Sequence, residues 1–206
     1  YTAASGTLTF AASDTSETFT VTPTSDTTNE SNETITVTLA TASGATIGST
    51  NNPATITLTD NDSLTISSPS FTDGGNIPVT FTCNGSDVSP ALNWVSTPSG
   101  TQSFYLQVRD IDADNFVHWA VKNISASSTG VAQDAVPTSG VEFFNDFGLT
   151  GWGGPCPPVE DGAHTYQFTI YALDTATLSS STVSEALTEL STHILEQHSI
   201  TGEYDA

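Results

Sequence analysis

Basic residues are almost missing from this chain. Its 206 residues include 2 Lys plus Arg against 23 Asp plus Glu, which gives a formal net charge of -21 at neutral pH. A surface with this charge repels polyanions, so we expect no nucleic-acid partner, and an anionic membrane is a poor partner. Methionine is absent as well. We interpret this composition, which is rich in Ser and Thr, as that of an extracellular or cell-surface protein, although a halophilic protein would also be acidic.

Long apolar runs and the common catalytic motifs are also absent. No stretch reaches the roughly 18 apolar residues that a membrane span requires. There is no G-x-S-x-G elbow, H-E-x-x-H motif or P-loop. We therefore predict a protein that has no membrane span and is not an enzyme. A hydrolase of unknown type is the least favoured alternative.

Cysteine is scarce, with Cys83 and Cys156 as the two in the chain. Their spacing fits no zinc motif. They allow a single intramolecular disulfide, and the alternative is a pair of buried thiols. The residues alone leave both interpretations open.

Residues 1–62 alternate Thr with aliphatic or aromatic residues, as in Thr34-Ile35-Thr36-Val37. This period of two is typical of half-buried strands. Four such stretches lie near 6–10, 17–22, 33–40 and 54–60. They predict a truncated antiparallel sandwich, and its unpaired edges favour self-assembly by addition of a strand from another chain.

Five carboxylates accompany these strands: Asp26, Glu30, Glu33, Asp60 and Asp62. Carboxylate oxygens suit Ca²⁺, but in so acidic a chain a solvated polar end is the simpler interpretation. The segment also resembles the C-terminal part of a Calx-beta domain, in the strand-like run 33–39 and in the closing Asp60-Asn61-Asp62. The resemblance implies that these carboxylates can bind Ca²⁺ as a cofactor, and that the chain begins inside the family's pattern.

The character of the chain changes after Asp62, where Trp, Pro and Gly become common, so we place a second domain at 63–206. Strand-like runs follow at 79–82, 103–109, 116–122 and 164–172. Thr182 and Glu185 form a capping box for a helix whose apolar face continues to Leu195. The predicted fold class is therefore mainly β, with a C-terminal helix on the second domain.

Several ordered blocks of this second domain resemble the bacterial branch of the phosphatidylethanolamine-binding protein family. The resemblance covers nearly all of residues 64–206. Among the blocks are Ser68-Pro69-Ser70-Phe71, Val108-Arg109-Asp110-Ile111-Asp112, His118-Trp119, Gly151-Trp152-Gly153-Gly154-Pro155-Cys156-Pro157-Pro158 and His164-Thr165-Tyr166.

The resemblance implies a β-sandwich with a small pocket for phosphate, phosphorylated head groups such as phosphoethanolamine, or similar anions. By position, its lining comprises Asp110, Asp112, His118, Gly154, Pro155, His164 and Tyr166. The residue types fit this role: His164 and Tyr166 are two apart on a strand and share a face. Imidazole and phenol groups supply donors, and a Gly-rich loop can bring backbone N–H groups to an oxyanion. We assign Asp110 the role of orienting a histidine.

Two positions depart from the family's pattern, because Ile111 and Asp114 stand where the family usually has proline. Loss of proline frees φ and restores an N–H group, so the loop after Asp110 is expected to be looser or differently shaped. A carboxylate at Asp114 would weaken anion binding if it faced the pocket.

Two functions from different classes follow. The first is a non-catalytic extracellular module that binds a small anion and is carried on a Calx-beta spacer. The second is a structural or adhesive surface protein, such as a filament subunit, that assembles through the open sandwich and keeps a vestigial pocket. His193 and His198 lie in or beyond the predicted helix and are assigned no function.

Overall fold

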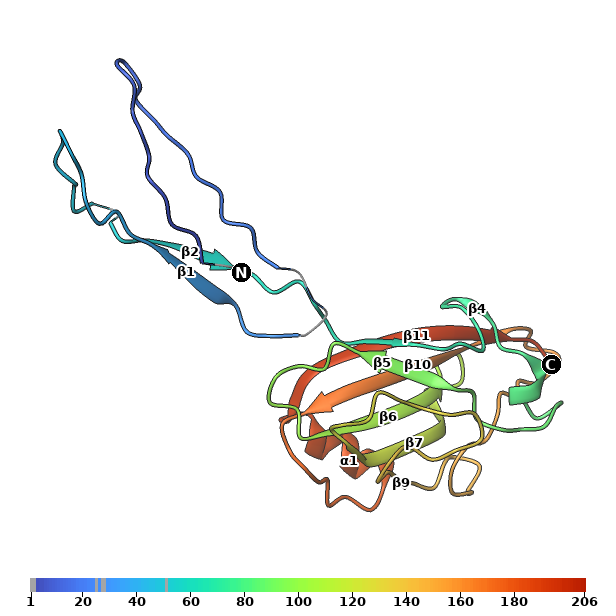
Figure 1. The fold of residues 1–206 in the computed structure, drawn as a ribbon. Helices are drawn as coiled ribbons and strands as arrows, with labels where there is room; N and C mark the ends of the chain where they lie inside the picture. Colours follow the sequence, from blue (N-terminus) through green and yellow to red (C-terminus); the bar gives the residue numbers. More distant parts are fainter. Residues whose placement is uncertain (1–2, 25, 27–28, 51) are drawn as a thin grey trace. The chain divides into compact units, whose positions relative to one another are not determined.

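The computed structural model describes residues 3–24, 26, 29–50 and 52–206. The chain divides into two compact units, Tyr1–Thr27 with Ser31–Asp60 and Thr28–Glu30 with Asn61–Ala206 (Figure 1). Each unit is considered separately below.

The first unit contains one antiparallel pair of strands, β1 (Glu33–Val37) and β2 (Ala54–Leu58). Ile35 is buried in this pair, but its partner Ile56 is 46% exposed. The strands expected near 6–10 and 17–22 are not strands in the structure, and Phe10 and Phe19 are at least half exposed. The described residues of the first unit therefore form a β-hairpin and not the predicted sandwich. No second sheet in this part of the chain covers the apolar side chains.

The second unit is built on a six-stranded sheet with the order β4-β11-β10-β6-β7-β9. These strands are β4 (Gly75–Asn76), β6 (Ser103–Asp110), β7 (Phe116–Ser125), β9 (Val141–Glu142), β10 (His164–Leu173) and β11 (Ile194–Tyr204). A three-stranded sheet has the order β3-β5-β8, from β3 (Thr65–Ser67), β5 (Leu92–Val95) and β8 (Gly130–Val131). The predicted strands at 103–109, 116–122 and 164–172 are all present.

Both faces of the six-stranded sheet are buried. Phe104 and Phe168 belong to a core cluster that also contains Trp94 of the three-stranded sheet. Tyr105, the neighbour of Phe104, belongs to a second cluster together with Leu190 of the helix α1 (Val183–Leu190). Because successive side chains of a strand point to opposite faces, the two clusters lie on opposite sides of this sheet. A sheet covered in this way is a rigid base for the side chains at its strand ends.

Among the described residues α1 is the only helix of more than one turn, and a capping box marks its first turn. The predicted capping box is confirmed, since Thr182 and Glu185 exchange side-chain and backbone hydrogen bonds. The helix stops at Leu190, however, and the expected continuation of its apolar face to Leu195 is wrong. The residues from Ile194 onward form β11. No described helix is long and apolar enough to cross a membrane.

Candidate ligand-binding site

Two neighbouring strands bring the central pair of the site together. β6 ends at Asp110 and β10 begins at His164, and Tyr166 lies opposite Asp110 in the register. His164 Nδ1 is 2.7 Å from Asp110 Oδ2, and both residues are buried. Because the carboxylate accepts, the imidazole donates through Nδ1. Asp110 thus holds His164 in one orientation, as the sequence predicted.

A β-bulge turns His118 toward this pair. Val108 pairs with Trp119 but Arg109 pairs with Val117, so His118 is an extra residue in β7. Bulges re-aim side chains in this way. The His118 ring lies 5.1 Å from the Tyr166 ring, at 88° to it. The residue comes from a third strand and completes the site.

The surroundings of His118 fix its orientation and its charge. Its Nδ1 is 2.6 Å from the Gly153 carbonyl oxygen, and the Phe116 and Phe147 rings pack edge-on against it. Burial lowers the pKa of His118, while the Gly153 carbonyl and the charge of Asp110 oppose that shift. The net direction favours a neutral imidazole at neutral pH.

A further polar side chain of the site is the buried phenol of Tyr166. Its side chain is fully buried, and its hydroxyl lies near the Asp110 side chain and the Cys156 backbone, both of which affect its pKa, although neither contact meets strict hydrogen-bond geometry. Burial, followed by the charge of Asp110, raises the pKa of Tyr166, so the hydroxyl keeps its proton.

The loop after Asp110 was expected to be looser or differently shaped, and its hydrogen bonds argue against the first of these alternatives. Ile111 donates its N–H to the Thr165 carbonyl at 3.0 Å, a bond that proline could not make. Asp112 donates its N–H to Asp110 Oδ1 and accepts the Thr165 N–H on Oδ2. The latter bond is the main cause of the lowered pKa of Asp112. Asp114 is exposed with φ 50°, which the proline ring cannot adopt.

Two N–H groups of the Gly-rich rim, those of Gly153 and Gly154, are bonded within the protein. Gly153 donates to the His118 carbonyl at 3.0 Å, and Gly154 donates to Asp87 Oδ1 at 2.7 Å. Pro155 has no N–H. A Cβ on Gly154 would lie 2.5 Å from the Phe81 carbonyl oxygen, so glycine is needed for close packing. Asp87 had no sequence signal for this role, because its loop is distant in the chain.

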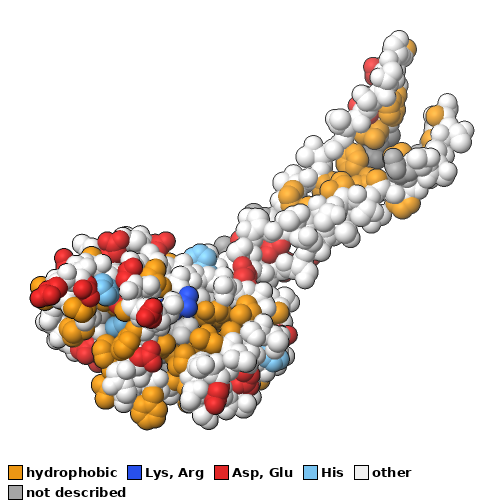
Figure 2. Space-filling model, turned by 180° about the vertical axis from the view of Figure 1, so that it is seen from behind, with side chains coloured by type: hydrophobic (Ala, Val, Ile, Leu, Met, Phe, Trp, Pro, Cys, Tyr) orange, Lys and Arg blue, Asp and Glu red, His pale blue; other side chains and the backbone are white. Residues whose placement is uncertain are grey.

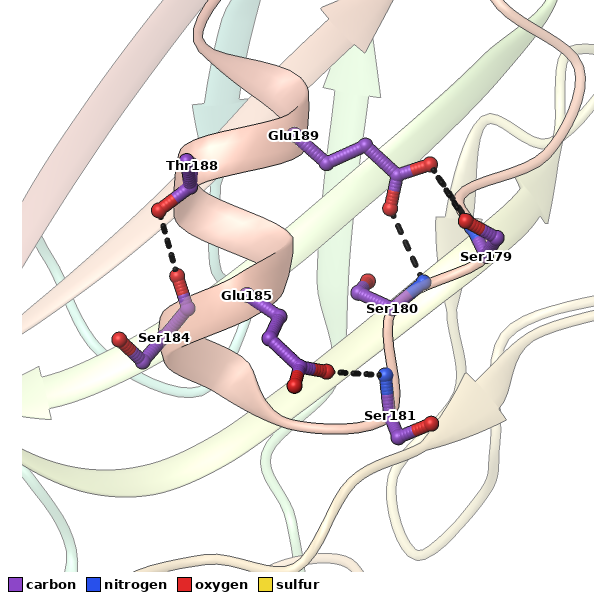
Figure 3. A pocket seen from close by; sticks show the side chains of 7 residues that line it. All are labelled: Ser179, Ser180, Ser181, Ser184, Glu185, Thr188 and Glu189. Atoms are coloured by element: carbon purple, nitrogen blue, oxygen red, sulfur yellow. Dashed lines mark hydrogen bonds between the residues drawn. The ribbon is translucent and has the colours of Figure 1, made fainter.

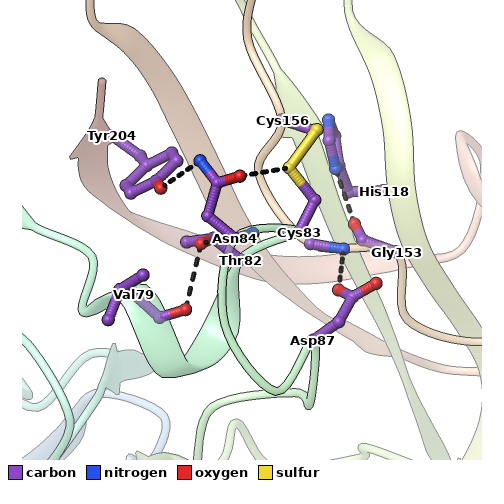
Figure 4. The surroundings of a disulfide bond; sticks show 10 residues. Val79, Thr82, Cys83, Asn84, Asp87, His118, Gly153, Cys156 and Tyr204 are labelled. Atoms are coloured by element: carbon purple, nitrogen blue, oxygen red, sulfur yellow. Dashed lines mark hydrogen bonds between the residues drawn. A yellow bond between two sulfur atoms is a disulfide. The ribbon is translucent and has the colours of Figure 1, made fainter. Parts of the chain in front are cut away.

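A disulfide joins this rim to the loop that contains Asp87 (Figure 4). Cys83 and Cys156 are bonded, with their Cα atoms 5.5 Å apart. Cys83 also donates its N–H to the Pro155 carbonyl at 3.1 Å. The structure thus has the bridge, and not the alternative of two buried thiols. Figure 4 shows His118 and Gly153 close to the disulfide, so the bridge supports the wall that positions this imidazole.

Two hollows on the surface of the second unit lie away from these residues. One of about 510 Å³ is lined by Ser179, Ser180, Ser181, Ser184, Glu185, Thr188 and Glu189 (Figure 3). The backbone N–H groups of Ser179 and Ser180 bond to Glu189 and lower its pKa to about 2. Another hollow of about 260 Å³ borders Lys122 and Phe143. Neither contains a residue of the histidine site, and we favour that site because its two imidazoles are held in fixed orientations.

The other two histidines lie outside the site. His193 Nδ1 is 2.7 Å from Asp174 Oδ1 in an exposed pair, and His198 Nδ1 accepts the Ile66 N–H at 3.3 Å. Among the described residues no group of three or more His, Cys, Asp or Glu side chains is arranged to hold a metal ion. Calcium binding by the carboxylates of Asp26, Glu30, Glu33, Asp60 and Asp62 stays a prediction.

Comparison with known proteins decides the family. The model of the family described as "Phosphatidylethanolamine-binding protein" matches residues 67–205, which is more than half of the chain. The chain belongs to the phosphatidylethanolamine-binding protein family. The match contains all of the histidine site and leaves the first unit outside.

Individual relatives agree with this assignment. A candidate lipoprotein of Mycobacterium tuberculosis, LppC, is 44% identical over 115 residues, and the match covers 55% of this chain and 57% of the relative. The chain thus spans little more than half of that protein. The crystal structure of Escherichia coli YbcL, titled a new member of the mammalian family, has a TM-score of 0.66 and 32% identity, covering 69% of this chain and 98% of YbcL. A homologue from Chlamydia trachomatis has a TM-score of 0.65 and 29% identity over 70% of this chain and 98% of its own.

Proposed function

We propose that the protein is a non-catalytic binding protein, outside the cell or at its surface, that takes phosphate or a phosphorylated head group into the histidine site. The observation that carries this proposal is the pair of oriented imidazoles, His164 held by Asp110 and His118 held by the Gly153 carbonyl, beside the Tyr166 ring. Small-molecule sites combine apolar walls with a few convergent polar groups. Here Phe116 and Phe147 supply the wall beside His118.

The location outside the cell rests on three features. The visible face of the second unit carries scattered acidic side chains and very little positive charge (Figure 2). A disulfide is typical of oxidising compartments, and a relative is named as a candidate lipoprotein. We propose that the first unit is a Calx-beta-like spacer whose acidic residues bind Ca²⁺.

We also propose that the protein does not catalyse a reaction on its ligand. The Asp110–His164 pair has the geometry of a general base and its orienting carboxylate, so chemistry is conceivable at this position. Turnover of a generic phosphoester substrate by the purified protein, lost in His164→Ala, would contradict a purely binding role.

Calorimetric titration of inorganic phosphate and phosphoethanolamine, near pH 6 and near pH 7.5, tests the binding function. We expect saturable binding that strengthens at the lower pH, because protonated imidazoles attract an anion. His164→Ala should abolish it, whereas His193→Ala should not, since His193 forms a similar pair with Asp174 outside the site. Absence of saturable heat for both ligands at both pH values would refute the proposal.

A second candidate function is assembly into a larger surface structure. The observation in its favour is the β1–β2 hairpin with half-exposed apolar residues beside it, which invites a further strand. This alternative predicts that light scattering at high protein concentration detects dimers or larger species. A monodisperse monomer under those conditions would exclude it.

A further inference from the structure

Three polar side chains follow one another on one buried face of the central strand β6. Tyr105, Gln107 and Arg109 are two positions apart, so they share the face that α1 covers, where Tyr105 packs in the same cluster as Leu190. Tyr105 and Gln107 are 0% and 2% exposed, whereas Arg109 is partly exposed. Polar groups inside a sheet are costly unless they are hydrogen-bonded, so their partners indicate what this stripe is for.

The neighbouring strand β10 widens the stripe into a polar patch. Each member has a polar residue opposite it in the register: Tyr171 opposite Tyr105, Thr169 opposite Gln107 and Gln167 opposite Arg109. The rings of the two tyrosines are 5.7 Å apart, and both belong to the cluster under α1. At the other end of the patch Arg109 and Gln167 are partly exposed. The polar patch is therefore closed at its tyrosine end and open to solvent at its arginine end.

Two buried groups of the polar patch lack a hydrogen-bond partner in the parts of the chain that the structure describes, namely the Tyr105 hydroxyl and Gln107 Oε1. Burial raises the pKa of Tyr105, and the positive charge of Arg109 opposes that shift. The hydroxyl thus keeps its proton, and the guanidinium is near enough to act on it. Half a turn of the Gln107 carboxamide exchanges its oxygen for its NH₂ group within the same shape. Tyr105 and Gln107 can therefore both donate to a bound acceptor.

Arg109, the single arginine of the chain, is not neutralised by a carboxylate. Its Nε–H and one Nη2–H donate to Gln167 Oε1, at 3.1 and 2.7 Å. A guanidinium has five N–H donors, so three remain for other acceptors. The chain has 23 Asp plus Glu, yet the ion pairs within the described ranges all involve histidine. The open end of the polar patch thus carries a positive charge that bonds to a neutral amide.

We propose that the polar patch binds a small carboxylate, which accepts hydrogen bonds from Arg109 and from Tyr105. A carboxylate matches the planar fork of a guanidinium with two parallel hydrogen bonds. This site is separate from the histidine site, because Asp110 and Tyr166 pair with each other on the opposite face of the sheet, where Tyr166 belongs to the other core cluster. The inference therefore does not depend on the proposed phosphate binding.

Ordered water and chloride are the competing occupants of the polar patch. A water molecule would satisfy the Tyr105 hydroxyl, but it carries no charge to set against Arg109. Chloride carries the charge, but a single atom cannot accept two parallel bonds from the guanidinium fork. A carboxylate offers both, and its bonds to the guanidinium are charge-assisted. The three occupants therefore predict different responses to salts.

The single arginine makes the test direct, because its side-chain Nε–H gives one signal in a nitrogen-edited NMR spectrum. Sodium acetate and sodium chloride are titrated into the whole chain at constant ionic strength, at about pH 6.5, where acetate is ionised. We expect acetate to shift the Arg109 signal along a saturable curve with a dissociation constant on the order of 10 mM. Chloride should bind at least roughly fivefold more weakly, because it lacks the matching geometry. The side-chain signals of Lys122, which bonds to the Ser180 carbonyl, should not follow that curve.

Tyr105→Phe isolates the contribution of the buried hydroxyl, because the ring that packs in the core is kept. We expect acetate to bind about tenfold more weakly to this variant, which corresponds to the loss of one hydrogen bond. Tyr204→Phe is the matched control, since the Tyr204 hydroxyl accepts from Asn84 and lies outside the polar patch. This control should bind acetate like the wild-type protein.

An Arg109 signal that ignores acetate, or that responds equally to acetate and chloride, would overturn the inference and leave water as the occupant of the patch. Equal acetate affinity in Tyr105→Phe and the wild-type protein would also overturn it, because the hydroxyl would then take no part in binding. The ring signals of His118 and His164 report on the histidine site in the same samples. Failure here would therefore leave the proposed phosphate binding standing, and the reverse also holds.

Discussion

Replacement of both Cys83 and Cys156 with serine is expected to lower the free energy of unfolding of the second unit by about 4 kcal/mol. The disulfide closes a loop of 73 residues. In the chain-entropy account, the stabilisation grows with the logarithm of loop length and reaches this value for a loop of this size. The expected loss is a large fraction of the stability of a typical domain.

Urea unfolding followed by tryptophan fluorescence measures this loss, because the three tryptophans, Trp94, Trp119 and Trp152, all lie in the second unit. Reduction of the wild-type protein should reproduce the effect of the double variant. The variant itself should be insensitive to reductant, which is the control. A change in midpoint equivalent to less than about 1 kcal/mol would show that the bridge adds little to the contacts around it.

Asp110→Ala is expected to weaken phosphate binding by about 30- to 150-fold. The substitution removes the acceptor of a buried, charge-assisted hydrogen bond to His164, which is worth about 2–3 kcal/mol. His164 then loses the partner that fixes its Nδ1 as the donor, and the ring can rotate. The Asp112 N–H loses its acceptor at the same time.

The chain offers a matched control in Asp174→Ala. The pairs His164–Asp110 and His193–Asp174 have the same length of 2.7 Å, but the second is exposed. Exposed ion pairs contribute about 0–1 kcal/mol, so this variant should leave binding unchanged. NMR titration of His164 distinguishes orientation from simple loss of charge. If Asp110→Ala altered neither the affinity nor the titration of His164, Asp110 would have no positioning role.

Much of the second unit could be predicted from sequence, because its strands follow simple patterns. Three of the four long strands, β6, β7 and β10, are dense in apolar and β-branched residues, and the Thr182–Glu185 capping box marks the start of the helix. Local chemistry determines these elements. Tertiary contacts determine only which of these strands and helices lie next to one another.

The elements that sequence analysis missed are those in which local and tertiary signals compete. Ile194 and Leu195 continue the helical period of α1, but a turn bonds the His193 N–H to the Leu190 carbonyl and the strand β11 follows. Gly202 weakens the strand pattern of β11, yet a Cβ there would lie 2.6 Å from Ile77. Residues 79–82 resemble a strand, but Val79–Phe81 is a short 3₁₀ helix after Pro78.

The residues of the site could be named from the sequence, but the bulge and the hydrogen bonds that orient them could not. The spacing of His164 and Tyr166 places both on one face, and both are buried there. The bulge that turns His118 depends on a register shift between two strands, which no local pattern encodes. The hydrogen bonds of the Gly153 and Gly154 amides could not be predicted, because their acceptors, the His118 carbonyl and Asp87, come from distant segments.

The position of β11 in the sheet has a consequence for how the protein is made. This strand pairs with β10 along its whole length and with β4 near the start of the second unit. During translation β10 emerges first and keeps one open hydrogen-bonding edge until residues 194–204 leave the ribosome. A nascent chain with such an edge is prone to association. We therefore expect the unit to fold late and slowly, because its closing contacts join residues more than a hundred positions apart.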